Sequence, residues 1–484
     1  MAWHHELAQK ALNRNYYTWD LERPEPALPS SYFWTWDHST NWVLDDPGMQ
    51  NTGCYNAYYK HPDTFAEDYR RLTDLAAGLG VRGIVIWGFL RDAHGGVEYG
   101  KRVASYGGSR GVDIMPGFGT TWYGGAYYEG DHPLNLQVFL AKYPEARMLG
   151  EDGEPYVFNG EYGACPAHPA YREWLLESID WIYREFEIGG VNLENGDYLV
   201  DYHPLTQAAR ASWSQDDPEV FFFQGLSYRQ ALEAIGERLP ETLATYAIYT
   251  GFHCTNELVQ NTGIPEKHPA MFGVLPSLGV CQWTLTGMLL PKPLPLTAYL
   301  DNGAPAAAFD NPNWPADLRP SSTRSAGFVH QGSQWHGGSR YYCIVSTIKE
   351  ACLRAYRSGL EGVAIHGEVT NRWIPAALNY LAFSHFIHWP EDSLRDFGKK
   401  TLSQVLGSQS AGEAFVDAMA HWDAGTLTDT LKSSARPEAQ SFSSRIAGSS
   451  CKDANELQRY NFWRWLSTAV KTEPGTKDVG VLAV

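Results

Sequence analysis

The chain has 484 residues, of which 44% are hydrophobic and only 19% are charged. Its formal net charge of −17 and its lack of any basic run exclude a binding surface for nucleic acid or for an anionic membrane. No apolar run approaches the ~20 residues that a membrane span needs. The seven cysteines include no CxxC pair, so neither a zinc site nor a disulfide framework is indicated.

The first residues, MAWHHELAQKALNRN, carry charge where a secretory signal needs an apolar stretch, so we expect a cytoplasmic protein. Further along, short apolar runs alternate with longer segments of helical period, which predicts parallel strands joined by helices. The runs that we interpret as strands are 31–37, 81–88, 112–119, 189–198, 243–252, 277–287, 325–332 and 361–371. Eight strands in this alternation predict an α/β fold, the (β/α)8 TIM barrel.

The same pattern divides the chain into three parts. We expect an N-terminal segment over 1–30, the (β/α)8 barrel over 31–375, and a helical C-terminal extension with a polar tail over 376–484. The extension has a helical pattern to about residue 422, and the sequence then becomes polar and rich in serine. Residues 120–165 are too long for a plain connection and are rich in Tyr and Gly, so we expect this loop to be functional.

Polar and aromatic side chains gather where the predicted strands end, and the active site of such a barrel lies at the carboxyl ends of its strands. They are Trp36, Asp37, His38 and Asn41 after the first strand, Arg91, Asp92 and His94 after the second, Tyr123 and His132 after the third, Glu194, Asn195 and Asp197 after the fourth, and Glu368, Asn371 and Arg372 after the eighth. A single carboxylate of this kind is often a loop cap or a salt-bridge partner. Agreement among several strands favours a site.

The residue types point to sugar chemistry. Cleavage of a glycosidic bond needs one group that protonates the leaving oxygen and another that activates water or attacks the anomeric carbon. The 18 Trp and 28 Tyr provide flat apolar surfaces that suit sugar rings, although a Trp-rich core would also account for them. The sequence therefore predicts a glycoside hydrolase with Asp37, His132 and Glu194 as its catalytic candidates.

His132 follows Asp131, a neighbour that would favour the charged imidazolium. A histidine in this place can act as a general acid near neutral pH, or it can simply cap the helix that follows. The histidines lie singly on different strands, and no GxGxxG follows a strand. We therefore expect no metal and no nucleotide cofactor.

Three segments, TWDHSTNW at the first strand, YYEGDHPLN after the third and GGVNLENGDY at the fourth, give the chain a family likeness. It resembles the inverting exo-sialidases of glycoside hydrolase family 156, over roughly residues 30–375. The resemblance implies a base at Asp37, an acid at His132 and a sugar contact at Asn371. It also implies arginines that clamp the sialic carboxylate, and location makes Arg91 and Arg372 the candidates.

The remaining predicted contacts with substrate are Trp36, His38, Tyr123, Asn195, Asp197 and Glu368. A different assignment keeps the reaction but makes Glu194 the acid, with Asp37 or Asp197 as its partner, on a neutral or uronic sugar. The sequence is also compatible with a sugar-binding barrel without catalysis and with a metal-dependent hydrolase or isomerase. The expected partner is a glycan, with neither nucleic acid nor membrane, and a homodimer stays open.

Overall fold

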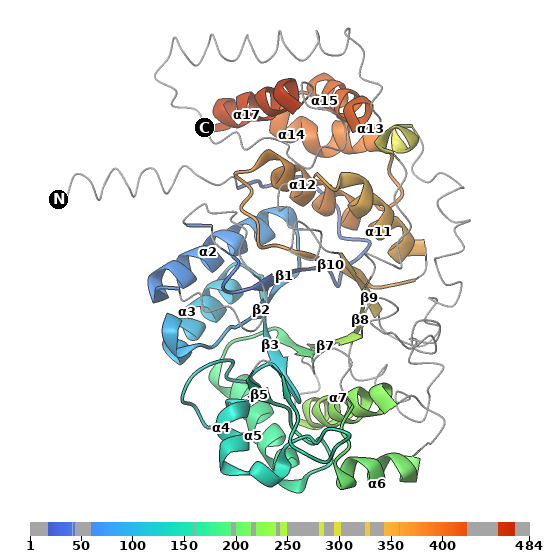
Figure 1. Cartoon of the computed structure of the whole chain (residues 1–484). Helices are drawn as coiled ribbons and strands as arrows, with labels where there is room; N and C mark the ends of the chain where they lie inside the picture. Colours follow the sequence, from blue (N-terminus) through green and yellow to red (C-terminus); the bar gives the residue numbers. More distant parts are fainter. Residues whose placement is uncertain are drawn as a thin grey trace, which may run out of the picture.

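A computed structural model gives the fold of the chain (Figure 1). It describes residues 18–40, 42–43, 60–158, 160–194, 200–213, 219–238, 243–248, 280–284, 295–301, 325–329, 343–357, 359–423 and 454–469. Among these residues, no helix is both long and apolar enough to cross a lipid bilayer.

Eight parallel strands form a closed barrel, so the predicted fold class is confirmed. The strands are β1 (Tyr32–Trp36), β2 (Gly83–Trp87), β3 (Asp113–Gly119), β6 (Gly190–Glu194), β7 (Leu243–Ile248), β8 (Val280–Thr284), β9 (Ser325–Val329) and β10 (Gly362–His366). Each coincides with a run predicted from the sequence. Around the ring the order is β1-β10-β9-β8-β7-β6-β3-β2. The first and last strands of the chain therefore pair and close the barrel.

Helices surround the ring of strands (Figure 1). The longer ones are α2 (Pro62–Leu79), α3 (Gly96–Ser109), α5 (Pro169–Glu185), α7 (Glu219–Arg238), α11 (Val345–Arg357) and α12 (Ile374–His388), and the short ones are η1 (Asp92–His94), α4 (Leu136–Lys142), η2 (Pro144–Ala146), α6 (Pro204–Trp213) and η4 (Leu296–Tyr299). Helix α2 ends at Gly80, which adopts a φ of 68° that residues with a side chain disfavour. Helix α3 contains four glycines, an unusual number for a helix.

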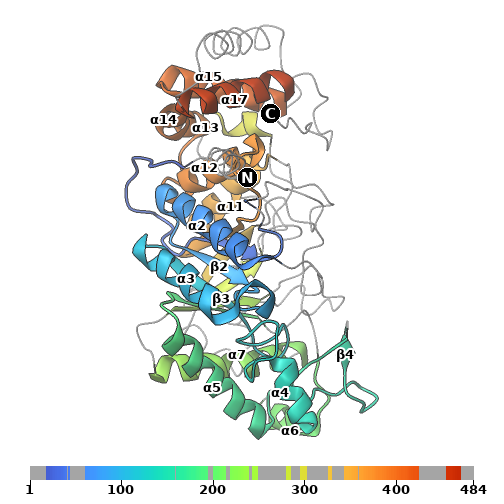
Figure 2. The ribbon, with the colours of Figure 1, turned by 90° about the vertical axis from the view of Figure 1, so that its left-hand side faces the viewer.

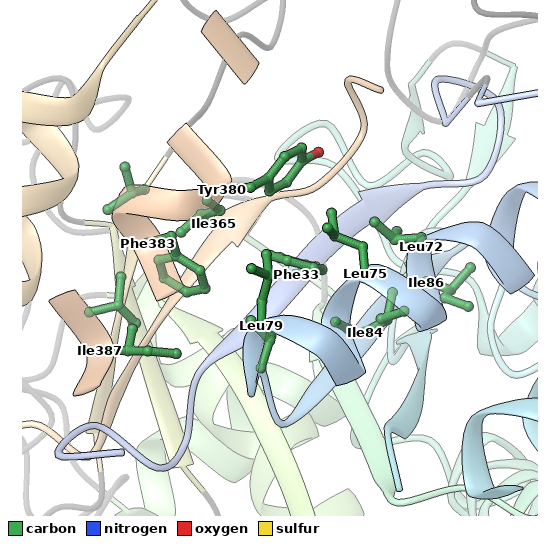
Figure 3. Packing of buried hydrophobic residues seen from close by; sticks show 14 of the residues in the cluster. Phe33, Leu72, Leu75, Leu79, Ile84, Ile86, Ile365, Tyr380, Phe383 and Ile387 are labelled. Carbon is green, nitrogen blue, oxygen red and sulfur yellow. The ribbon is translucent and has the colours of Figure 1, made fainter. Parts of the chain in front are cut away.

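The main hydrophobic core lies between the strands and the outer helices (Figure 3). Phe33, on the outer side of β1, packs against Tyr380 and Phe383 of α12, with ring centres 5.2 and 6.0 Å apart. Leu72 and Leu79 of α2 reach the same region. Because side chains of a strand alternate, the residues on either side of Phe33 point into the barrel.

Aromatic side chains line the inside of the barrel, and the polar side chain of Asn192 is buried among them. The indole N–H groups of Trp34 and Trp87 both donate to the side-chain oxygen of Asn192, at 3.3 and 3.0 Å. Asn192 in turn donates to Thr245 at 2.7 Å. These bonds satisfy the buried amide, which would otherwise be costly. They also fix the pleat of β6, so that Glu194, two residues after Asn192, faces the inside at the carboxyl end.

A helical cap follows the barrel and stacks beyond α12 (Figures 1 and 2). It comprises α13 (Leu394–Phe397), η7 (Gly398–Leu402), α14 (Ser403–Leu406), α15 (Gln409–Asp423) and α17 (Ala454–Ala469). In α17, Phe462 and Trp463 pack on Phe415 of α15, with ring centres 5.8 and 5.4 Å apart. This part of the predicted polar tail is thus a packed helix. The division at residue 375 falls at the start of α12, and the three-part division stays a prediction.

Candidate active site

Three aromatic side chains form a floor at the carboxyl end of the barrel. Trp36 ends β1 and Trp87 ends β2, and both indoles point inward with ring centres 5.5 Å apart. Tyr123, from the loop after β3, sits edge-on to them, at 6.3 Å from Trp36 and 5.7 Å from Trp87. Tyr123 is partly exposed, whereas both tryptophans are buried. Its ring therefore offers the flat apolar surface that a sugar ring would contact.

Tyr123 holds this position in a strained backbone. Its φ of 56° makes it the one non-glycine residue with positive φ in the described ranges. For a residue with a side chain this region costs roughly 1–2 kcal/mol, and such strain gathers at functional sites. Two glycines follow directly, Gly124 at φ 78° and Gly125 at φ 83°, so the whole turn is left-handed.

A pair of variants separates the backbone of Tyr123 from its ring. Tyr123→Ala and Tyr123→Gly both remove the ring, but only glycine relieves the φ of 56°. We expect the glycine variant to be more stable than the alanine variant by about 1 kcal/mol, and both to bind substrate more weakly. Urea unfolding and KM measure the two effects. An alanine variant as stable as the glycine variant would show that the turn is not strained.

Two glutamates flank this floor. In the ring order, β1, β2 and β3 carry the floor, β6 borders β3, and β10 borders β1. Glu194 ends β6 and is 3% exposed, and Glu368 follows β10 and is 1% exposed. Glu194 falls on the inward alternation of β6, and Glu368 continues the inward alternation of β10 two residues beyond its end. The site thus has a carboxylate on each side of an aromatic floor.

Glu368 is held in place by its neighbours. Its Oε1 accepts hydrogen bonds from the backbone N–H of Trp36 at 3.2 Å and from the hydroxyl of Ser39 at 2.6 Å. Its Oε2 lies 3.6 Å from Nδ1 of His366. The two hydrogen bonds to Oε1 fix the orientation of this carboxylate, which suits a group that binds substrate rather than one that moves during the reaction.

Asp37 lies in a buried cluster with three cationic or ionisable partners. Its Oδ2 is 2.7 Å from Nε of Arg91 and 3.3 Å from Nε2 of His94, and its Oδ1 is 3.3 Å from Nδ1 of His38. The His94 ring stacks on Phe65 of α2 at 3.8 Å. The structure thus brings Asp37, His38 and Arg91 together, and the contact of His94 with Phe65 places the cluster on the side that faces the outer helices.

Electrostatics make Asp37 a weak proton acceptor. Burial alone would raise the pKa of this carboxyl, but Arg91 together with the hydrogen bonds from His38 and His94 holds the pKa well below its usual range. A general base works best when its pKa lies near the working pH. The arrangement is that of a buried ion pair, which positions Arg91.

Arg91 connects this cluster with the mouth of the barrel. Its guanidinium lies over the ring of Tyr128 at 4.4 Å and forms an ion pair with Glu129. Tyr128 belongs to the inner aromatic cluster with Trp36 and Trp87. Sequence reasoning missed both Trp87 and Tyr128. The alternation along β2 is the signal that identifies Trp87 as inward-facing.

His132 lies against an outer helix. Its ring stacks on Tyr127 at 4.4 Å and lies 4.9 Å from the ring of Trp181 in α5. Its Nδ1 accepts the backbone N–H of Leu134 at 3.2 Å. Burial lowers the pKa of His132, and Asp92 opposes this shift, so the imidazolium is not favoured in the way that Asp131 led us to expect. The structure does not bring His132 into contact with the floor or with the two glutamates among the residues described.

This placement predicts that His132→Gln has little effect on turnover. A general acid contributes typically 10²- to 10⁴-fold, whereas a histidine stacked between Tyr127 and Trp181 contributes only packing. We expect kcat on a glycoside with a poor leaving group to fall less than about tenfold. A fall in the range of a general acid, restricted to poor leaving groups, would restore His132 as the donor.

The remaining predicted site residues fall into two groups. Asn371 is buried and Arg372 partly buried just after β10, on the same end of the barrel as the floor. Asn41, Asn195 and Asp197 lie outside the described residues. Among the residues that are described, no group of three or more His, Cys, Asp or Glu side chains is arranged to hold a metal ion.

Comparison with known proteins finds similarity in solved structures alone. No protein-family model matches the chain, and no curated protein is similar to it. Among solved structures, an α-L-fucosidase isoenzyme 2 from Paenibacillus thiaminolyticus is 12% identical with a TM-score of 0.43, covering 74% of this chain and 50% of its own. An α-amylase from Geobacillus thermoleovorans is 8% identical with a TM-score of 0.44, covering 76% and 80%. The PgaB (BpsB) glycoside hydrolase domain from Bordetella bronchiseptica is 11% identical with a TM-score of 0.44, covering 74% and 98%. This chain spans about half the length of the fucosidase.

Proposed function

We propose that the protein is a glycoside hydrolase that cleaves a terminal sugar at the carboxyl end of its barrel. The observation that carries this proposal is the aromatic floor of Trp36, Trp87 and Tyr123 with Glu194 and Glu368 on either side. An apolar platform with a few convergent polar groups is the usual design of a small-molecule site. Carboxylates beside such a platform are the groups that glycosidic cleavage commonly uses.

Glu194 is the carboxylate that acts at the anomeric carbon. It faces the inside of the barrel directly above Asn192 and is almost fully buried. In a single displacement, the inverting course that the sequence resemblance implies, Glu194 takes a proton from the attacking water. Glu368 is already hydrogen-bonded by Ser39 and Trp36, so we assign it to a sugar hydroxyl. The attacking water is thus activated at the end of β6, by Glu194.

An acidic sugar such as a sialic acid is the second candidate. It is favoured by Arg91, whose guanidinium lies in the mouth over Tyr128, because arginine binds carboxylates in a fork geometry. However, the same guanidinium already forms ion pairs with Asp37 and Glu129. A sialoside would have to share Arg91 with these two carboxylates.

A panel of aryl glycosides tests the proposal directly. The panel includes neutral, uronic and sialic sugars, and proton NMR follows the anomer that is released first, with and without a chelator. Turnover of one sugar with first release of the inverted anomer is expected. Release of the retained anomer would make Glu194 a nucleophile. Binding without turnover across the panel would identify a sugar-binding barrel, and loss of activity with the chelator would identify a metal-dependent enzyme.

A further inference from the structure

A small hairpin stands at the rim of the barrel mouth. Strands β4 (Val157–Phe158) and β5 (Glu161–Tyr162) pair antiparallel, and β4 projects from the body of the barrel (Figure 2). After the hairpin, Ala164 donates its backbone N–H to Thr121, in the loop after β3, at 2.9 Å. Before it, Leu149 accepts the backbone N–H of Tyr202, which follows β6, at 3.0 Å. The hairpin is therefore tied to the β3 and β6 sector, where Glu194 ends its strand.

The register of the hairpin decides which way Glu161 points. Phe158 is paired with Glu161, and residues directly opposite in an antiparallel pair share a face. The Phe158 ring lies 6.3 Å from Trp122, the residue before Tyr123. Tyr162 occupies the other face, under the guanidinium of Arg147 at 3.8 Å. Glu161 thus shares the face that is turned toward the loop of the aromatic floor.

The Glu161 side chain is partly buried, and one of its carboxyl oxygens has no hydrogen-bond partner among the residues described. This oxygen, Oε2, is inaccessible to solvent. Buried polar atoms are almost always paired unless function requires otherwise. Burial raises the pKa of Glu161 to about 7, and the Arg91 guanidinium, the charged group that acts on it, opposes this shift. Glu161 therefore holds its proton below about pH 7 and lies within electrostatic range of the arginine at the mouth.

We propose that Glu161 is the proton donor of the reaction and that the hairpin holds it above the mouth, over the β3 and β6 sector. This inference rests on the proposed glycosidase function. As the bond between the anomeric carbon and the leaving oxygen breaks, that oxygen takes the proton of Glu161 and departs as an alcohol. Water supplies a hydroxyl to the anomeric carbon and gives its other proton to Glu194. Exchange with solvent returns a proton to Glu161 and removes one from Glu194.

The variant Glu161→Gln, compared with Glu154→Gln, tests the donor. Glu154 is exposed in the same loop, so its substitution controls for a lost carboxylate near the hairpin. The substrates are a methyl glycoside and a 4-nitrophenyl glycoside of the sugar that the panel selects. We expect Glu161→Gln to lower kcat/KM about 10²- to 10³-fold on the methyl glycoside and much less on the aryl glycoside, which departs without protonation. It should also remove the alkaline limb of the pH profile near pH 7.

Equal losses on the two substrates, or an unchanged alkaline limb, would overturn the donor role while leaving the hydrolase function intact. A wild-type protein that hydrolyses nothing in the panel would instead defeat the proposed function, and the donor role with it. An infrared difference spectrum between wild type and Glu161→Gln gives a readout that is independent of turnover. It should show a protonated carboxyl at pH 6 that is lost through pH 7, and an ionised Glu161 at pH 6 would contradict the inference.

Discussion

Replacing Glu194 with glutamine should lower kcat by about 10²- to 10⁴-fold, the range for a group that transfers a proton in the transition state. The amide keeps the size of the side chain but cannot accept the proton of water. Because Glu194 acts at the anomeric carbon, the loss should be the same for good and poor leaving groups. Steady-state kinetics on both kinds of substrate measure it.

Glu361→Gln is the matched control for that experiment. Glu361 directly precedes β10 at the amino end of the barrel, where it accepts a hydrogen bond from Ser30. Its substitution should leave kcat unchanged, because the groups that act on substrate lie at the opposite end. Glu194→Gln with wild-type turnover would refute the assignment of Glu194 and leave Glu368 as the carboxylate to test.

Asp37→Asn should destabilise the fold by about 3–5 kcal/mol, because it removes one partner of a buried ion pair and leaves the Arg91 charge partly uncompensated. Both side chains are 2% exposed, so solvent does little to replace the lost charge. Urea unfolding at pH 7 measures the difference. The control is Asp113→Asn, whose ion pair with Arg82 is exposed and should contribute less than about 1 kcal/mol.

The pH dependence of this difference has a defined sign. The folded pKa of Asp37 is lowered well below its usual range, so its contribution to stability is fully present above the unfolded pKa of about 3.9. It is lost as pH falls from there through the folded pKa. The stability gap between wild type and Asp37→Asn should therefore stay constant from pH 8 to about 5 and narrow below about 4. A variant that loses kcat without losing stability would instead support Asp37 as the base that the sequence resemblance implies.

The strands could be predicted because barrel strands are buried on both faces and read as continuous apolar runs. Gly83–Trp87 and Gly362–His366 are examples in which every residue is buried. Helix α3 is harder to predict, because its glycines look like loop residues in sequence. Gly100 and Gly107 are instead sites of close packing, where a Cβ would meet Leu90 at 2.8 Å and Ile114 at 2.4 Å.

The site was predicted less well than the fold. The place of a residue after a strand tells at which end of the barrel it lies, but not the direction in which its side chain points. Glu194 and Glu368 could be identified as strand-end carboxylates. His132 also follows a strand, but its ring direction depends on Trp181, which lies 49 positions away and offers no local signal. Glu161 was missed for the same reason, since nothing in FNGEYG shows that a hairpin will bury this carboxyl.

The closing pair of the barrel has a consequence for synthesis in the cell. β1 pairs with β10, about 330 positions later, and contacts of such sequence separation form slowly. Glu368 reaches the backbone N–H of Trp36 across this same seam. A ribosome-bound chain therefore exposes the open edge of β1 until the last strand emerges, and the aromatic floor has no second glutamate beside it until then. A nascent chain would be both catalytically incomplete and dependent on protection from aggregation during translation.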